Sequence, residues 1–141
     1  MSDPQKTSIA RQFVAALPHS ADLSMQVEEV GDGYCVMSLP YDTRFVGDPS
    51  TGVLAGGVIT ALLDTCCGTA VMAHPGGAGG TATLGLRIDY MRPAEPGKSV
   101  MARADCYRMT RTVAFVKAIA WTDDREKPVA TAAGSFTVEG R

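Results

Sequence analysis

The sequence predicts an α+β protein in which an antiparallel sheet of about six strands wraps around one long central helix. Its 141 residues correspond to one domain, over 1–141, with a hydrophobic core of its own. A long apolar segment with helical spacing, about 56–72, lies in the middle of the chain, and short extended runs make up most of the rest. This helix is the only element long enough to cover one face of such a sheet.

The N-terminal third predicts a helix followed by a β-hairpin. Apolar residues with helical spacing predict a helix over about 8–17 that ends at Pro18. Alternating apolar residues over 23–27 predict a half-buried strand, and the Gly-Asp-Gly sequence at 31–33 predicts a turn. Residues 34–39 then return as the second strand of the hairpin.

The remaining segments predict loops around the central helix and a β-rich C-terminal half. Residues 40–54 and the glycine-rich stretch 74–80 are interpreted as loops. A four-stranded meander is expected after the second loop, with strands over 83–91, 99–109, 112–122 and 128–138. The open face or an edge of this sheet is a natural place for a second subunit.

Composition and charge exclude several classes of function. Thirteen Lys and Arg against fifteen Asp and Glu give a net charge of −2, without the basic excess that a nucleic-acid backbone requires. The four cysteines form no CxxC motif and only two histidines accompany them, so no metal site is expected. The apolar run 58–63 stops at Asp64, far short of a membrane span, and no signal-peptide core precedes the first helix. We therefore expect reduced cysteines and a cytoplasmic protein that binds neither nucleic acid nor membrane.

The central helix has two different faces. The bulky apolar face, expected to lie on the sheet, comprises Ile59, Leu62, Leu63, Cys66 and Ala70. The opposite face consists of small residues around one carboxylate: Gly57, Thr60, Ala61, Asp64 and Gly68. Each helical glycine costs roughly 1 kcal/mol relative to alanine, which indicates close approach by a second helix or a ligand. The alternative interpretation is a solvated aspartate on an outward face.

The start of the central helix predicts an oxyanion-binding site. The first amides of a helix have no internal partner, and the glycines at 56 and 57 leave room for a ligand carbonyl to reach them. Asp64 lies about 10 Å further along the axis. In a face-to-face dimer the second subunit would supply this carboxylate instead. The alternative for the glycine pair is a tight connection from loop to helix.

Three separated segments resemble hotdog-fold acyl-CoA thioesterases, specifically the phenylacetic-acid-degradation branch that is related to 4-hydroxybenzoyl-CoA thioesterases. In this family a G-x-x-H-G-G stretch opens the long helix, and an acidic residue follows nine positions after the His. Here these two positions are Ala55 and Asp64. Residues 86–94 and 129–136 resemble the family's later strands, so the resemblance covers about 20–138.

The resemblance implies a hotdog fold that forms dimers or tetramers, with active sites between subunits. It implies that the Gly56 amide, with Gly57 beside it, polarises the thioester carbonyl. Asp64 from the opposite subunit would act as general base on water or as nucleophile, and the Thr83 hydroxyl would assist.

Two positions depart from the family pattern. Ala55 replaces the His, which is thought to shape the loop, and Pro49 stands where many members have an Asn. Asp48 matches this Asn only if the loop carries a one-residue insertion. A carboxylate there cannot donate as an amide does, and near Asp64 it would raise one carboxyl pKa by repulsion.

The sequence lacks the residue patterns that other catalytic mechanisms require. No GxSxG motif is present, and the two cysteines at 66 and 67 lie on or beside the apolar helix face, which argues against serine and thiol nucleophiles. His19 and His74 are not placed for the histidine that hotdog hydratases require. Arg108 and Arg111 flank a strand turn and are the best candidates for coenzyme A phosphates, with solvated surface charges as the alternative.

The sequence thus predicts an acyl-CoA thioesterase that releases free acid and coenzyme A from an aromatic or short- to medium-chain acyl-CoA. No metal or cofactor is expected, since coenzyme A is part of the substrate. The substitution at Ala55 keeps open an alternative of another class, a non-catalytic acyl-CoA-binding or regulatory protein on the same fold.

Overall fold

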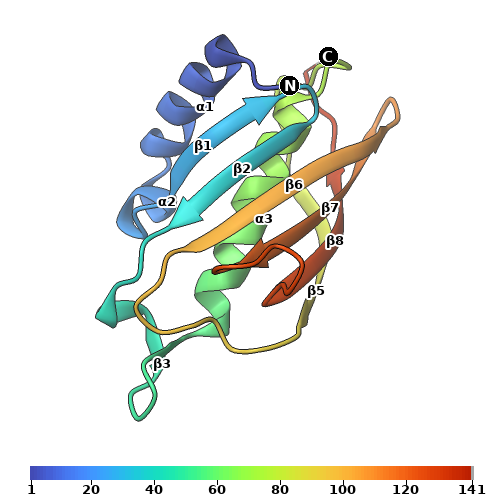
Figure 1. Ribbon diagram of the computed structural model, residues 1–141. Coiled ribbons are helices and arrows are strands. Elements are labelled where there is room, and N and C mark those ends of the chain that lie inside the picture. Colours follow the sequence, from blue (N-terminus) through green and yellow to red (C-terminus); the bar gives the residue numbers. More distant parts are fainter. Residues whose placement is uncertain (141) are drawn as a thin grey trace.

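The computed structural model describes residues 1–140 and shows a six-stranded antiparallel sheet that curves around one long helix (Figure 1). In sheet order the strands are β1 (Gln26–Gly31), β2 (Tyr34–Leu39), β6 (Val100–Met109), β7 (Val113–Trp121), β8 (Ala130–Thr137) and β5 (Thr83–Tyr90). The helices are α1 (Pro4–Ala16), α2 (Pro18–Asp22) and the central α3 (Gly56–Ala73). The predicted α+β class and the sheet wrapped on a helix are confirmed.

The predicted four-stranded meander is wrong in the position of β5. Strands β6, β7 and β8 do form a meander, but β5 pairs with β8 at the edge and β6 pairs with β2. The connection from β5 to β6 over 91–99 contains two prolines and is too long for a tight hairpin. It therefore carries the chain across to the middle of the sheet, and Thr83 is left opposite Phe136 on β8.

The core lies between α3 and the concave face of the sheet. Leu62, Leu63 and Cys66 have no exposed surface, which confirms the predicted apolar face of the helix. Alternate residues of β7, among them Ala114 and Val116, meet this face from the sheet side. By length and hydropathy α3 passes as a membrane span, but half of it is buried inside the fold, as expected for the core helix of a wrapped sheet.

The N-terminal elements differ from the sequence prediction at their boundaries. Helix α1 begins at Pro4 instead of residue 8, because the Asp3 carboxylate caps the helix and proline is favoured in the first turn. A second short helix, α2, was not predicted. Because it extends to Asp22, β1 begins at Gln26 and not at the predicted residue 23. Ser24, which has a positive φ of 59°, lies in the connection between α2 and β1.

The segment predicted as loop over 40–54 contains three short elements. A 3₁₀ turn over Thr43–Phe45 is followed by the small hairpin of β3 (Val46–Asp48) and β4 (Val53–Leu54). The Ala55 N–H donates to the Phe45 carbonyl at 2.9 Å. This bond ties the hairpin to the start of α3.

Candidate active site

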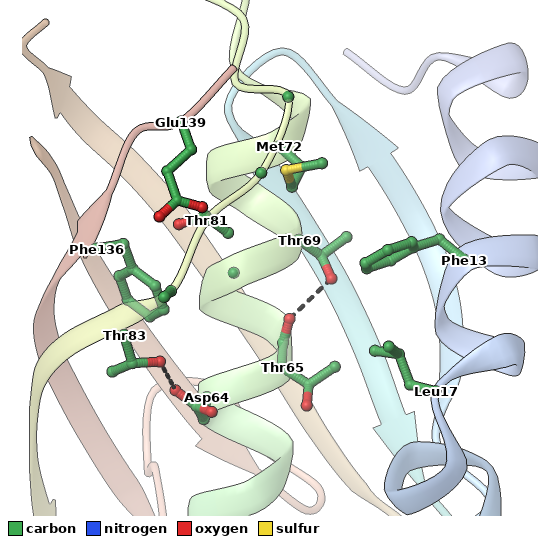
Figure 2. A pocket seen from close by; sticks show the side chains of 14 residues that line it. Phe13, Leu17, Asp64, Thr65, Thr69, Met72, Thr81, Thr83, Phe136 and Glu139 are labelled. Atoms are coloured by element: carbon green, nitrogen blue, oxygen red, sulfur yellow. Dashed lines mark hydrogen bonds between the residues drawn. The ribbon is translucent and has the colours of Figure 1, made fainter. Parts of the chain in front are cut away.

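A carboxylate and a hydroxyl meet where the start of β5 passes over the middle of α3. Thr83 Oγ1 donates to Asp64 Oδ1 at 2.7 Å (Figure 2). The other carboxylate oxygen, Oδ2, accepts no hydrogen bond from the residues that the structure describes. Thr83 therefore fixes the orientation of the carboxylate and leaves one oxygen available to a water molecule or a substrate.

This pair lies at the side of a cavity of about 380 Å³. The cavity lies over the outward side of α3, between α1, the start of β5 and the residues just before it (Figure 2). Phe13 projects into it from α1, Leu17 from the link between α1 and α2, and Glu139 borders it from the C-terminal segment. The small-residue face of α3 thus borders a space large enough for part of a ligand, with Asp64 at its edge.

The start of α3 presents free amides, as the sequence predicted. Ala55 occupies the N-cap position and offers no side-chain cap, and the Gly56 and Gly57 N–H groups have no partner within residues 1–140. A Cβ added at Gly57 would meet nothing within 4 Å, so this glycine is not required by packing within the chain. The positive end of the helix dipole therefore faces open space.

Tyr90 is a residue of this region that the sequence analysis did not identify. Its hydroxyl donates to the Gly56 carbonyl at 2.7 Å, and the Thr60 hydroxyl is a further partner. The ring also lies beside Gly56, where a Cβ would come within 3.4 Å of it. Tyr90 ends the strand that begins with Thr83, so one strand holds both the carboxylate and the first peptide of the helix. The feature of the sequence that could have identified Tyr90 is an aromatic residue with a hydroxyl group at the end of a predicted strand.

One chain does not bring its two predicted catalytic groups together. Gly56 and Asp64 lie on the same helix, about 12 Å apart along its axis. A single thioester carbonyl cannot contact the Gly56 amide and place its carbon beside Asp64 at this separation. The two predicted groups therefore lie at separate places, one at the start of α3 and one at its middle, and we call these places half-sites.

Asp48 is held by its own turn. Its carboxylate accepts from the Ser50 hydroxyl at 2.6 Å and from the Ser50 N–H at 3.0 Å. The Ser50 hydroxyl, followed by the Ser50 N–H, lowers the pKa of Asp48. Within one chain, repulsion by Asp64 does not raise this pKa, in contrast to the effect that proximity of the two would have.

The remaining predicted groups lie apart from the cavity. Arg108 and Arg111 are exposed at the turn between β6 and β7, and neither forms an ion pair with the described residues. Cys66 is buried, and its thiol donates to the Cys35 carbonyl. Burial raises the pKa of Cys66 well above its usual value, which argues against a thiolate nucleophile.

The fold and the site define a hotdog protein of the thioesterase class. The family model of the thioesterase superfamily matches residues 51–129, more than half of the chain. The chain belongs to this superfamily. A Halobacterium salinarum protein named "Putative esterase" is 32% identical over 125 residues, covering 82% of this chain and 81% of that protein. Family and relative together support a hydrolase of the thioesterase type.

Solved structures agree with the fold. A Pseudomonas aeruginosa protein is 40% identical with a TM-score of 0.84, covering 94% of this chain and 98% of that one. The E. coli PaaI protein from the phenylacetic acid degradation operon has a TM-score of 0.84 at 17% identity, covering 96% of this chain and 95% of that one. At this identity the second likeness shows the hotdog fold alone.

Proposed function

We propose that the protein is an acyl-CoA thioesterase that hydrolyses an acyl-CoA to the free acid and coenzyme A. The observation that carries this proposal is the Asp64–Thr83 pair beside a cavity in a chain of the thioesterase superfamily. A carboxylate with one oxygen fixed and one free is suited to take a proton from water next to a bound thioester.

In the proposed reaction the two half-sites act on one carbonyl. The Gly56 N–H, with Gly57 beside it, donates to the thioester oxygen and stabilises the charge that develops there. Asp64 of the facing subunit removes a proton from water, whose oxygen bonds to the carbonyl carbon. The C–S bond then breaks, and the thiolate of coenzyme A takes the proton back from Asp64. In a variant of this route, an Asp64 oxygen bonds to the carbonyl carbon and the C–S bond breaks, which releases the coenzyme A thiolate and leaves a mixed anhydride. Water then hydrolyses the anhydride to the free acid and the Asp64 carboxylate, and the proton released goes to the thiolate.

The proposal requires a homodimer or a dimer of dimers. Strand β5 is the sheet edge next to the site, and both of its faces are largely exposed. Leu84, Tyr90 and Met91 at this edge are 59%, 50% and 57% exposed. An isologous contact along β5 would cover these residues and bring the small-residue face of one α3 towards that of its partner.

The coenzyme A phosphates are assigned to Arg108 and Arg111. Both guanidinium groups are exposed and free of carboxylate partners among residues 1–140, so they can bind phosphate without breaking an ion pair.

We place the reaction in the cytoplasm, since the four cysteines are all free and buried. No metal or cofactor enters the proposed steps.

A non-catalytic acyl-CoA-binding protein is the second candidate, because Ala55 replaces the histidine of the family pattern. The test is hydrolysis of a panel of aromatic, short-, medium- and long-chain acyl-CoAs, followed by Asp64→Asn. This change keeps the shape of the side chain and removes the base, so we expect kcat to fall about 100-fold or more. Binding and oligomeric state should not change.

The outcomes separate the two candidates. Tight binding of an acyl-CoA without hydrolysis of any member of the panel would favour the binding protein. Full activity of Asp64→Asn would leave the fold assignment intact and overturn the mechanism assigned to Asp64.

A further inference from the structure

The cavity beside Asp64 does not end at α1. A second cavity of about 240 Å³ lies between α1 and α3 and is lined by Ile9 and Val30 among other residues. The two cavities share three lining residues: Phe13, Thr69 and Met72. The two cavities therefore adjoin at these residues, and together they are called here the α1–α3 groove, whose lining extends from Asp64 to Ala73 near the end of α3. Along the helix this span is about 14 Å.

The α1–α3 groove is mainly apolar, and α1 and α3 supply most of the side chains along its length. Phe13 lies at the junction of the cavities and projects from α1 towards α3, opposite Thr69 (Figure 2). It is 48% exposed, and Ile9 one turn earlier is 61% exposed. Two large, exposed apolar side chains on the wall of the groove indicate an apolar occupant.

The charges along the groove exclude the phosphate-bearing part of the substrate. The charged residues around the first cavity are Asp64 and Glu139, both carboxylates. The second cavity has one cation, Lys6, whose ammonium group donates to the Asp32 carboxylate at 2.7 Å and to the Ala73 carbonyl at 2.8 Å. No free cation remains in the groove among the described residues, so an anion bound there would be repelled and unpaired.

From these observations we infer that the α1–α3 groove binds the acyl group of the thioester and selects neutral, apolar chains of medium length. The inference rests on the proposed function, because the position of Asp64 fixes the reacting carbonyl at one end of the groove. The chain then runs past Phe13 towards Ile9, and the nucleotide end of coenzyme A points away from α1. Glu139 disfavours acyl groups that end in a carboxylate.

The first experiment measures kcat/KM for butyryl-, octanoyl- and dodecanoyl-CoA with Phe13→Ala and Ile9→Ala. We expect Phe13→Ala to lower octanoyl and dodecanoyl hydrolysis about tenfold and to leave butyryl hydrolysis within about twofold. Ile9 contacts only the far cavity, so Ile9→Ala should affect dodecanoyl-CoA alone. Tyr107→Ala is the matched control, because Tyr107 is an exposed aromatic on the other face of the sheet.

The second experiment compares octanoyl-CoA with octanedioyl-CoA, which differ by a terminal carboxylate. The wild type should prefer octanoyl-CoA by about tenfold or more, and Glu139→Gln should narrow this ratio by raising kcat/KM for octanedioyl-CoA. The shift should be smaller at high salt, because Glu139 is exposed.

Each outcome bears on a defined statement. Equal effects of Phe13→Ala on all chain lengths, or none on any, would overturn the acyl assignment of the groove while hydrolysis itself persists. Absence of hydrolysis for every substrate would instead overturn the proposed function. An unchanged octanoyl-to-octanedioyl ratio in Glu139→Gln would remove Glu139 from the selectivity.

Discussion

The two edge strands of the sheet differ in whether other parts of the chain cover them. At the β1 edge, side chains of α1 bind the backbone that would otherwise be free: Arg11 donates to the Val27 carbonyl at 2.9 Å, and the buried Thr7 hydroxyl accepts from the Val30 N–H at 3.1 Å. The first residues close the edge further through a bridge between Ser2 and Gly31. At the β5 edge, no described segment covers the outer side of the strand.

This difference separates stability from function. An uncovered strand edge invites pairing with another chain, and proteins usually block it. Here one edge is blocked within the chain, and the other remains open next to Asp64, Thr83 and Tyr90 (Figure 1, Figure 2). We infer that the open edge is where a second subunit completes the site. Changes at the β5 edge should then affect assembly and catalysis, whereas changes to the β1 edge contacts that lie outside the α1–α3 groove should affect the free energy of unfolding alone.

The largest effect is expected from a charge on the open edge. Leu84→Lys should dissociate the oligomer, because it places an ammonium group in the inferred contact between the β5 strands of two subunits. Activity should fall about 100-fold, since the separated chain lacks the facing amide that stabilises the oxyanion. Analytical ultracentrifugation and acyl-CoA hydrolysis measure both effects. Gln26→Lys, on the closed β1 edge, is the matched control and should change neither. A fully active oligomeric Leu84→Lys protein would remove β5 from the interface.

A smaller loss is expected when the link between β5 and the start of α3 is broken. Tyr90→Phe removes the hydroxyl that donates to the Gly56 carbonyl at 2.7 Å. We expect a lower kcat by about tenfold with little change in KM, and about 1 kcal/mol less stability. Steady-state kinetics with Tyr107→Phe as control make the test. An unchanged kcat would show that Tyr90 does not position this peptide.

The closed edge should respond in stability only. Thr7→Val removes the hydroxyl that accepts from the Val30 N–H and donates to the Asp3 carbonyl at 2.8 Å. The buried N–H then has no partner, which should cost about 1–3 kcal/mol of unfolding free energy. Urea denaturation measures this loss, while kcat should not change. Reduced activity of the folded Thr7→Val protein would contradict the separation of roles between the two edges.

The smallest effect is expected at Asp48. Hydrogen bonds from Ser50 lower the pKa of Asp48 below its unfolded value, so they add stability above that value and lose it as the pH falls through the folded pKa. Asp48→Asn should therefore reduce stability slightly at neutral pH and not in strong acid. The acidic limb of the pH–rate profile should stay in place. A shift of this limb to lower pH would show that Asp48 faces Asp64 of the partner subunit as a coupled pair.

The spacing of apolar residues and the positions of turn residues predicted most of the helices and strands, because both depend on interactions between residues close in the sequence. The helix over 56–72, its apolar face and the strand over 34–39 agree with the structure to within a residue. The order of the strands in the sheet could not be predicted from the sequence, since the position of β5 beside β8 depends on pairing between segments that are distant in the sequence. The N-terminal boundaries moved because the Asp3 cap and the α2 turn outweigh the apolar spacing used to place them.

The site was predictable in part for the same reason. The spacing from Ala55 to Asp64 and the strand start at Thr83 are visible in the sequence, and the structure joins Asp64 to Thr83. Tyr90 was not identified, because its role depends on the end of β5 meeting the first turn of α3. Phe13 and Glu139 were not identified either, because they line the cavity from segments that are distant from Asp64 in the sequence.

Complementation between two inactive variants tests most directly whether two chains build one site. Gly56→Pro removes the amide at the first helical position, where proline is tolerated, and Ala55 already has the extended ψ of 138° that precedes proline. Asp64→Asn removes the base. If each site combines Gly56 of one chain with Asp64 of its partner, refolding the two variants together should restore about a quarter of wild-type activity, through mixed dimers with one intact site. A mixture no more active than its separate parents, in which mass spectrometry nonetheless detects mixed dimers, would contradict the shared site.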